Sequence, residues 1–552
     1  MYKLEYNIWL YICICYNINM ENLNINENTI QISVEEYKRF KALEAREEEL
    51  NKRIELLEEA LRLAKQKRFG KSSEKISPES SEQLLYLFDE AETILAIEDI
   101  KDEEETTSVA SHTRRKYSNT LGDKLPENVP VEVVEHTLSY EELACPTCGT
   151  QMQEIGVDIR RELVIIPATI KVVEHRIHSY ACMKCKEEEL QTPIRSAEKE
   201  PALISGEFAT AEAVAYIMTQ KFVMGSPLYR QEMEWRRQGI ELSRQTMSNW
   251  ILKCAEIYLQ PLYNKLHEKL LSRDVIHADE TTLQVLKQLE RPNASKCYMW
   301  LYRTGSDAEN AIVLYDYQAG RGKEYPQKFL AGYEGYLQTD GYSVYHDLSD
   351  KITNVGCWAH LRRKFDEAKK ALPKGKSAEA SAAMKAMGYF TKIYKLEKKF
   401  AKLSFEERYT KRLKEEKPIL DEFLSWAKTL NVAPKSALGK ALVYLFNQEP
   451  YLINYLKDGR LEIDNNRAER SIKPFVIDRK NFLFANTARG AQGSAVIFSI
   501  IETAKENKLD PYRYLVYVLK QAKELHSSNE TNWVERLLPE NSPDECKVNS
   551  RC

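Results

Sequence analysis

Three acidic residues in the second half of this 552-residue chain occupy positions where a carboxylate needs an explanation. Asp279 lies in "VIHADETTLQV", residues 275–285, whose other residues predict a buried strand. Asp340 lies in "GYLQTDGYSVY", and Glu469 lies in "EIDNNRAERSIKPF". Burying an unpaired carboxylate costs several kcal/mol, so each of these positions requires a cation, a hydrogen-bond network or solvent at a cleft.

Together, the three carboxylates could form a two-metal site. Asp279 is expected in a strand, Asp340 at a strand end and Glu469 on a short helix, and such elements could hold two divalent cations about 3.5–4 Å apart. Two carboxylates near 4 Å repel each other by roughly 4 kcal/mol at an effective dielectric of 20, so a shared site requires a proton or a cation. Mg²⁺ is the hard, oxygen-binding candidate, and Mn²⁺ also fits.

Ordinary roles for these acids are the alternative. The chain contains 83 Asp and Glu residues, and most acids in proteins are solvated. Glu469 could be the capping-box partner of a short helix that Asn465 or Asn466 caps and Pro474 stops. Strand alternation predicts that Glu280, beside the first acid, points to the opposite face, toward solvent or an adjacent loop. Residue types and spacing leave both interpretations open.

Two cysteine pairs have the spacing of a structural zinc site. "CPTCGTQM" and "YACMKCK" each contain C-x2-C, with 33 residues between the pairs. Each tight turn can present two thiolates to one metal, and four thiolates leave no open coordination position, which predicts a structural Zn²⁺. Two redox dithiols or unliganded cysteines are the alternative. The predicted ligands are Cys145, Cys148, Cys182 and Cys185.

A helix-turn-helix pattern follows the cysteine pairs. Residues 227–237 suit one helix, Gly239 can adopt the positive φ of a turn, and Ser243 can cap a second helix. Helix hairpins with this spacing are also common in plain helical domains, so simple packing is the alternative to DNA contact. The residues expected to face inward are Met247, Trp250 and Ile251, and those expected to reach base edges are Arg244, Gln245 and Asn249.

Basic residues gather in two segments, although the formal net charge of the chain is only −3. Residues 62–75, "RLAKQKRFGKSSEK", are expected to contact phosphates, with Arg68 and Lys71 as the candidates. Residues 465–489 carry six basic residues against two acids, which suits a phosphodiester substrate beside a metal site. A solvated basic face is the alternative for any single residue. The candidates are Arg467, Arg470, Lys473, Arg479, Lys480 and Arg489.

The elements that must position these residues can be predicted from periodicity. Residues 33–66 are expected to be helical, with apolar residues at spacings of three and four that predict a short coiled coil and therefore self-association. An amphipathic helix docked on its own chain is the alternative. The seam consists of Leu50, Ile54, Leu57, Leu61 and Ala64.

Further along the chain, composition and periodicity change repeatedly. An acidic run at residues 77–105 carries a net charge of −10 and is expected to be a solvated linker or a cover for a basic surface. A strand-rich region interrupted by about a hundred helical residues predicts an α/β core with an inserted helical domain. The expected divisions are 1–32 unplaced extension, 33–76 coiled coil and basic segment, 77–130 acidic linker, 131–200 zinc ribbon, 201–273 helix-turn-helix-like region, 274–360 first part of the core, 361–460 helical insertion, 461–525 last part of the core and 526–552 tail.

The first residues raise the question of a membrane segment. "NIWLYICICYNI" is apolar for only about a dozen residues, too short to span a bilayer. Lys3 is offset by Glu5, where a signal peptide requires a positive charge. We therefore expect translation to start at Met20, with a membrane anchor or secretion signal as the alternative. The short apolar run predicts no membrane partner. Cysteines scattered outside the pairs, such as Cys254 and Cys297, favour a reducing cytoplasm.

Several motifs together resemble the IS66 family of bacterial insertion-sequence transposases. They are "HADETTLQV", "LQTDGYSVY", "GCWAHLRRKF" and "DNNRAERSIKPFVIDRKNFLFANTARGAQGSA". "RFGKSSEK", the cysteine pairs and "IIETAKENKLDPYRYL" match in the same order, so the resemblance covers the chain from about residue 33. This family is a branch of the DDE recombinases. The resemblance implies an α/β fold: an RNase H-like catalytic core with an inserted all-helical domain, preceded by the coiled coil, zinc ribbon and helix-turn-helix-like region.

The resemblance places the family's catalytic triad, and with it the Mg²⁺ or Mn²⁺ ligands, on Asp279, Asp340 and Glu469. Cys357 and His360 resemble a C-x2-H signature of many DDE enzymes, and His360 could orient a phosphate or the attacking water. A packed strand-to-helix turn is the alternative.

The implied activity is metal-dependent cleavage and transfer of DNA strands at the element's terminal repeats. A homodimer or higher oligomer in the bacterial cytoplasm would act on terminal repeats and target DNA, with small accessory proteins as further partners. Two alternatives stay open: a metal-dependent nuclease that does not join strands, and a non-catalytic DNA-binding protein derived from a transposase.

Overall fold

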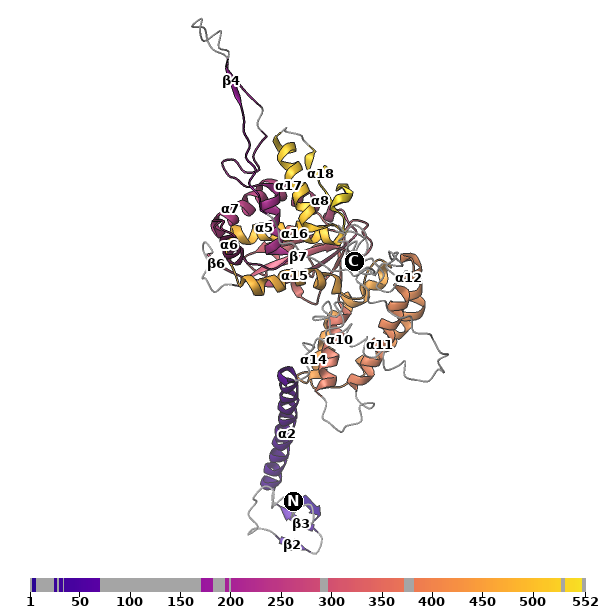
Figure 1. Ribbon diagram of the computed structural model, residues 1–552. Coiled ribbons are helices and arrows are strands. Elements are labelled where there is room, and N and C mark those ends of the chain that lie inside the picture. The colour runs from indigo at the N-terminus through magenta and orange to yellow at the C-terminus, as the bar shows by residue number, and fades with distance from the viewer. Residues whose placement is uncertain are drawn as a thin grey trace, which may run out of the picture. The chain divides into compact units, whose positions relative to one another are not determined.

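The computed structural model describes residues 2–5, 24–26, 29–32, 34–69, 170–181, 194–197, 200–287, 296–371, 382–527 and 532–548. The chain divides into two units, whose elements are labelled in Figure 1. One unit contains Met1–Asp102 and Glu268–Ile477, and the other contains Glu103–His267 and Asp478–Cys552. Several predicted site residues lie outside the described part: Lys71, Cys145, Cys148, Cys182, Cys185 and the side chain of Arg68.

A mixed sheet in the first unit has its strands in the order β10-β9-β6-β7-β8. β6 (Val275–Lys287) pairs antiparallel with β7 (Lys296–Thr304), which pairs antiparallel with β8 (Val313–Gln318). On its other edge β6 pairs in parallel with β9 (Gly335–Gln338), and β10 (Ile352–Val355) pairs in parallel with β9. The sheet is therefore antiparallel on one side of β6 and parallel on the other.

The burial of the β6 side chains changes along the strand. Val275 to Ala278 are all buried, whereas exposed and buried residues alternate from Thr282 to Val285. A strand covered on both faces gives the first pattern, and a hairpin with one solvent face gives the second. Asp279 lies at the transition, where a polar side chain can be reached from solvent while the strand before it is held rigidly.

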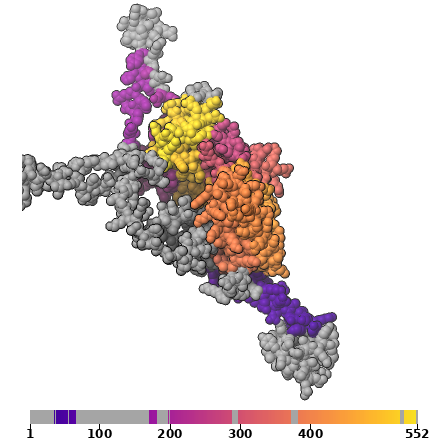
Figure 2. All heavy atoms as spheres, turned by 90° about the vertical axis from the view of Figure 1, so that its right-hand side faces the viewer, coloured from indigo at the N-terminus to yellow at the C-terminus, as the bar shows by residue number. Residues whose placement is uncertain are grey.

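A group of helices occupies the predicted helical insertion and belongs to the same unit. α10 (Trp358–Lys370) contacts α11 (Ala382–Phe400) and α14 (Ala437–Leu452) (Figure 1). α12 (Phe405–Lys411) and α13 (Lys417–Lys428) are joined by the π-helical turn η7 (Arg412–Glu416), and the 3-10 helix η8 (Ile453–Lys457) follows α14. The side chains of this orange segment form one continuous body in Figure 2. The core includes Trp358, Phe365, Phe390, Phe423 and Tyr455.

The helix predicted near the N-terminus is α2 (Val34–Phe69), and its apolar seam is exposed. Near its C-terminal end the helix contacts its own unit: Arg62 Nε donates to the Ala371 carbonyl at 2.9 Å, and the Ala437 N–H donates to Glu59 Oε1 at 3.1 Å. Self-docking therefore involves the end of the helix, while the seam stays accessible. The exposed seam residues are Leu50, Ile54, Leu57 and Leu61.

The second unit contains the predicted helix-turn-helix. α5 (Ala211–Phe222) precedes α6 (Leu228–Arg237), Gly239 has φ of 78°, and Ser243 caps α7 (Arg244–Cys254) by accepting the Thr246 N–H at 3.0 Å. The two helices and the turn were predicted correctly, as was burial of the inner face of α7. The buried inner residues are Met247, Trp250 and Ile251.

The remaining helices of the second unit come from two stretches of the chain, one directly after α7 and one near the C-terminus. η4 (Ala255–Leu259) leads into α8 (Gln260–Leu271), while α16 (Ala488–Glu506) and α17 (Pro511–Ser527) come late in the chain. α17 contacts α5, and α16 contacts both α5 and η4, so segments far apart in sequence form this unit together.

The first residues form strands. β1 (Tyr2–Glu5) and β2 (Asn24–Asn26) both pair antiparallel with β3 (Thr29–Ile32). Among the helices that the structure describes, none has the length and apolar composition needed to cross a bilayer.

Candidate active site

The parallel register between β6 and β9 fixes the positions of two predicted acids. The last register pair is His277 with Gln338, and Asp279 and Asp340 each lie two residues beyond it. Because parallel strands run in the same direction, both carboxylates lie just beyond the same end of the β6–β9 pairing, Asp279 within β6 and Asp340 after β9. The predicted location of Asp340 directly after a strand is confirmed, since β9 ends at Gln338.

The third predicted acid, Glu469, lies in the first turn of α15 (Asn466–Phe482). The prediction that Pro474 stops this helix is wrong, because the helix continues through Pro474 to its last residue. A proline inside a helix removes one backbone hydrogen bond and costs about 3 kcal/mol. Contacts with the sheet compensate for that loss: Arg303 of β7 donates to the Ser471 hydroxyl, and Tyr315 of β8 donates to the Ser471 carbonyl.

Asn465 links the start of α15 to the first strand of the site. Its Nδ2 donates to the Ala278 carbonyl at 2.8 Å, and its Oδ1 lies 3.0 Å from Nδ1 of His277. The expected capping role of this side chain is therefore wrong. Asp464 serves the helix start instead, since its Oδ1 accepts the Asn466 N–H at 3.1 Å. A buried amide thus fixes the helix that carries the third acid against the strand that carries the first.

Gln338 makes a second such link. This side chain is fully buried at the end of β9, and its Nε2 donates to the carbonyls of Glu462 at 2.5 Å and Asp464 at 2.8 Å. The segment leading into α15 is therefore held by both parallel strands. Because Asp279 and Asp340 each follow the last β6–β9 pair by two residues, these links hold all three carboxylates near the end of the parallel pairing.

The acids influence one another electrostatically. Burial, and then the negative charges of Glu280, Asp340 and Glu469, raise the pKa of Asp279 well above its usual range. Two backbone groups hold the carboxylates of Asp279 and Asp340: the Glu280 N–H donates to Asp279 Oδ1 at 2.8 Å, and the Tyr342 N–H donates to Asp340 Oδ1 at 2.9 Å. Carboxylates in such proximity are stabilised by a cation or by a shared proton.

Glu280 was expected to face solvent or an adjacent loop, and only the second possibility holds. Its side chain is 2% exposed, so the solvent-facing prediction is wrong. Arg321, from the loop between β8 and α9 (Glu324–Phe329), donates to Glu280 through Nε at 2.9 Å, and the Tyr345 hydroxyl donates to its other oxygen. The Arg321 guanidinium also lies 3.7 Å from the centre of the Tyr342 ring. Glu280 therefore neutralises the charge of Arg321 and orders the loop beside Asp340.

Cys357 and His360 lie against the third acid. One ligand atom from each of Cys357, His360 and Glu469 falls within 4.8 Å of the others, and His360 Nδ1 is 3.6 Å from Glu469 Oε1. Burial, followed by the charges of Glu469 and Asp464, raises the pKa of the Cys357 thiol well above its usual range. Its sulfur accepts the Asn465 N–H at 3.2 Å. The motif is thus a packed strand-to-helix turn that also directs a histidine toward the site.

The predicted phosphate-contacting residues separate between the two units. Arg467, Arg470 and Lys473 belong to the unit with the three acids, and Arg470 is exposed one residue after Glu469. Arg467 is bound to Glu462, with Nε 2.7 Å from Oε1. The other three belong to the second unit, where Arg489 forms an ion pair with Glu256. These three are Arg479, Lys480 and Arg489.

The predicted base-contacting residues of α7 are exposed. The Arg244 side chain is 69% exposed, and its backbone N–H donates to Glu232 at 3.2 Å. Gln245 Nε2 donates to Asn249 Oδ1 at 3.1 Å, so two neighbouring turns present amides on one face. The outward orientation of these side chains was predicted correctly.

Sequence reasoning missed the residues that hold the site together. His277, Gln338 and Asn465 are buried polar residues, and Arg321 and Tyr345 bind Glu280. The only available signal was a polar residue inside an apolar strand, as in "VIH" and "YLQ". Their partners lie far along the chain, so spacing could not reveal the contacts.

Four family models match the chain in succession. Residues 206–493, more than half of the chain, match the model described as "Transposase IS66 family" and contain all three acids. Residues 142–186 match "zinc-finger binding domain of transposase IS66" and contain all four cysteines of the two pairs. Residues 56–134 match "Transposase C of IS166 homeodomain", and residues 499–539 match "IS66 C-terminal element".

Two proteins of Sinorhizobium fredii are similar over most of the chain. The first, "Uncharacterized protein y4qI", is 30% identical over 545 residues, which is 94% of this chain and 94% of the relative. The second, "Uncharacterized protein y4jD", is 30% identical over 432 residues, or 76% of this chain and 81% of the relative.

The acids lie together where the parallel pairing of a mixed sheet ends. With the zinc-finger and transposase matches on either side of residue 200, the chain is a DNA transposase. The matched segments run in one consistent order through the chain. The chain belongs to the IS66 family of insertion-sequence transposases.

Proposed function

We propose that this transposase cleaves and joins DNA strands at the terminal repeats of its element, with Asp279, Asp340 and Glu469 as the catalytic carboxylates. The observation that carries the proposal is the parallel register that places two acids just beyond the last β6–β9 pair, together with a helix whose start is bonded to those same strands. The mixed sheet, interrupted by a helical segment before the third acid, supports an RNase H-like core.

The donor set fits a hard divalent cation. Three carboxylates offer only oxygen ligands, which Mg²⁺ and Mn²⁺ prefer, and their mutual repulsion favours bound positive charge. When bound, a pair of such ions would activate a water or a 3′-OH as the nucleophile and stabilise the leaving oxygen. Asp279 would hold the ions from β6 and Asp340 from the segment after β9, and Glu469 would complete the ligand set from the helix.

Neighbouring residues would orient the DNA. His360, 3.6 Å from Glu469, is placed to donate to a phosphate oxygen or to the attacking water. Arg470 is exposed beside Glu469 and would contribute positive charge to the phosphodiester backbone. Arg467 is bonded to Glu462, so its first role is to fix the segment before α15. The exposed amides of α7 would contact base edges in the terminal repeats.

Zinc and self-association complete the proposal. The four cysteine thiolates inside the zinc-finger match would hold one structural Zn²⁺. The exposed seam of α2 would pair two protomers so that both element ends are held in one complex. The DNA partners would be the terminal repeats and the target, with small accessory proteins as further partners in the bacterial cytoplasm.

A cleavage assay on DNA carrying the element's ends tests the proposal. With Mg²⁺ or Mn²⁺, the wild type should cut at the ends and join the released 3′ ends to target DNA. Asp340→Asn should reduce both reactions below detection while end binding persists, because the substitution removes one ligand charge without changing side-chain size. Asp350→Asn is the matched control, since Asp350 is an exposed acid outside the site.

The outcomes separate the candidate functions. Cutting without joined products would favour a metal-dependent nuclease. Equal binding with no cutting by either protein, even with accessory proteins added, would favour a DNA-binding protein that has lost catalysis. Undiminished cutting by the Asp340 variant would exclude the proposed triad.

A further inference from the structure

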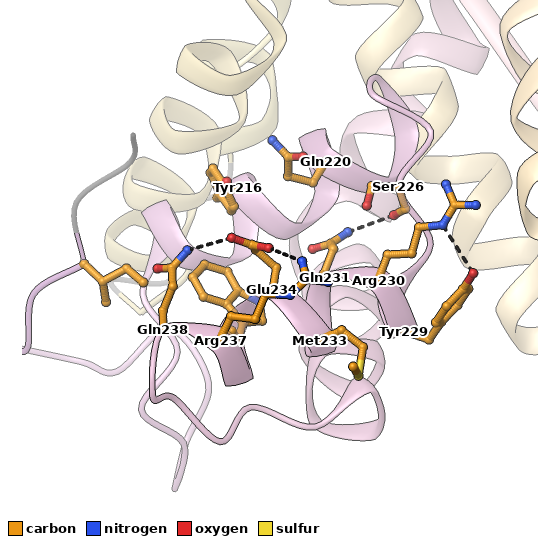
Figure 3. A pocket seen from close by; sticks show the side chains of 12 residues that line it. Tyr216, Gln220, Ser226, Tyr229, Arg230, Gln231, Met233, Glu234, Arg237 and Gln238 are labelled. Carbon is orange, nitrogen blue, oxygen red and sulfur yellow. Dashed lines mark hydrogen bonds and ion pairs between the residues drawn. The ribbon is translucent and has the colours of Figure 1, made fainter. Parts of the chain in front are cut away.

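A cavity of about 430 Å³ in the second unit is lined mainly by residues of α5 and of α6, the first helix of the helix-turn-helix (Figure 3). α5 and α6 form most of its wall, and Ile170 contributes from an extended segment that falls within the zinc-finger match. A volume in this range accommodates a small organic group. The residues that matter to its chemistry are Tyr216, Tyr229, Arg230, Gln231, Trp235 and Arg237.

Two buried polar atoms in the wall have no hydrogen-bond partner among the described residues. Gln231 is 5% exposed, and its Nε2 donates to the carbonyls of Ser226 at 3.0 Å and Ile217 at 3.3 Å, which leaves Oε1 without a donor. The indole N–H of Trp235 likewise has no acceptor. Unpartnered buried polar atoms are unfavourable, so a ligand that supplies one donor and one acceptor would be stabilised here.

The lining also includes aromatic rings and two arginines, with one acid, Glu234, among them. The rings of Tyr216 and Trp235 lie 5.7 Å apart at a tilt of 59°. Tyr229 is 49% exposed at the rim, where Arg230 Nε donates to its hydroxyl at 3.2 Å. Arg237 is bound to Glu234 at 2.9 Å, but both side chains are more than half exposed, so a phosphate could replace that partner at little cost.

We propose that this cavity binds a single unstacked nucleobase of single-stranded DNA. The base would stack on the aromatic wall, donate from its edge to Gln231 Oε1 and accept from the indole N–H of Trp235. Its flanking phosphates would lie at Arg230 and Arg237. This inference rests on the proposed function only in taking DNA as the substrate.

Single strands should be preferred for a physical reason. A base in a duplex has its edge paired and both faces stacked, so it can enter such a cavity only after unstacking, which costs a few kcal/mol. A base in a single strand pays little of that cost, and stacking on aromatic side chains is the usual source of affinity for single-stranded DNA. The cavity would therefore hold a base exposed where the duplex opens.

Cross-linking of the full-length chain tests the site directly. The probe is a labelled single-stranded oligodeoxynucleotide carrying 5-bromodeoxyuridine, compared with the same sequence as a duplex, and the protein carries Asp340→Asn so that no strand is cut. We expect photocross-links within residues 228–238 with the single strand and not with the duplex, mapped by mass spectrometry.

Affinity measurements by fluorescence anisotropy provide the second readout. Trp235→Phe keeps an aromatic ring and removes the N–H, so single-strand affinity should fall about fivefold. Tyr229→Ala should lower it about tenfold by removing a stacking surface. Tyr409→Ala, which truncates a comparably exposed tyrosine in α12, should leave it unchanged. Duplex affinity should change for none of the three.

Unchanged single-strand affinity in both cavity variants, or cross-links confined to other segments, would overturn the proposal. If a peptide from the zinc-finger match suppresses cross-link formation and unlabelled single-stranded DNA does not, the cavity binds a segment of this chain instead. The two proposals fail separately: a protein that cuts element ends without using the cavity contradicts only this one, and base binding without cutting contradicts only the catalytic one.

Discussion

At the scale of single residues, the candidate site contains buried amides that bond its elements together as well as the acids. Asp279 and Asp340 were predictable because a carboxylate in an apolar strand or at a strand end is unusual. Asn465 was not predictable, because an asparagine before a helix has a simpler local explanation as a cap. Its partners are His277 and Ala278, nearly two hundred residues earlier in the chain. Local pattern cannot reveal such a contact.

Asn465→Ala should weaken catalysis more than DNA binding. The substitution leaves the Ala278 carbonyl and His277 Nδ1 without their partner, which should lower the free energy of unfolding by about 2–4 kcal/mol. Loosening the start of α15 should also displace Glu469 and slow end cleavage. Urea titration and single-turnover cleavage measure the two effects, with duplex binding as the reference.

Asn431→Ala is the matched control, because Asn431 is exposed in a loop of the same unit. It should change neither stability nor cleavage. If the Asn465 variant cleaved at the wild-type rate despite reduced stability, the amide would have a folding role alone, and the positioning role would be excluded.

At the scale of elements, the helical periodicity of the insertion was predicted, but its polar interior was not. Arg412, in η7, is fully buried and donates to both oxygens of Glu397 at 2.7 Å. Tyr455 of η8 donates to Glu416 at 2.5 Å. Charged residues at three- and four-residue spacing predict a solvated helix face, so this buried network could not be predicted from spacing. The same limit explains α15, where Pro474 predicted a helix end and contacts with the sheet prevented it.

The network predicts a pH-dependent stability of the insertion. Burial, and then the charge of Glu397, raise the pKa of Glu416 from 4.5 to about 9. Because the folded pKa exceeds the unfolded one, the contribution of Glu416 is complete below about pH 4.5 and is lost as pH rises toward 9. Glu416→Gln keeps the hydrogen bond from Tyr455 without a titrating proton. The difference in melting temperature between this variant and the wild type should therefore increase, in favour of the variant, by about 2–4 °C from pH 5 to pH 8.

Thermal unfolding across that pH range, followed by circular dichroism, measures the difference. Glu422→Gln is the matched control, because Glu422 also accepts from a tyrosine, Tyr389, but is exposed. Parallel pH profiles for the wild type and the Glu416 variant would show that Glu416 titrates normally and would contradict the prediction.

At the scale of the whole molecule, the order of segments could be predicted because each has a distinct composition. Cysteine pairs, a helix hairpin, acids in strands and a basic helix are local signals, and the family matches follow them in the same order along the chain. The division into two units was not predictable. Each unit combines an early and a late part of the chain, and the boundary falls inside α8 and inside α15. A boundary inside a helix leaves no change in composition to detect.

Self-association is the property of the whole molecule that the structure makes testable. Leu57 is 63% exposed in the middle of the α2 seam, and its neighbours along the seam are at least half exposed. A row of apolar residues on a 36-residue helix is costly in water and is buried when a second helix packs against it. Leu57→Lys should therefore raise the dimer dissociation constant about a hundredfold or more, since both copies lose a buried leucine.

Sedimentation velocity over a range of protein concentrations measures this effect, and end pairing can be followed with two differently labelled DNA ends. Lysine is a good helix former, so α2 itself should persist in the variant. Val443→Lys, at a comparably exposed aliphatic position of α14, should leave association unchanged. If the Leu57 variant associated like the wild type, the seam would not be the contact. A variant that is monomeric, binds single ends normally and no longer pairs two ends would instead establish that α2 joins the protomers, because the proposed catalytic acids and the proposed base-contacting residues of α7 lie in other segments.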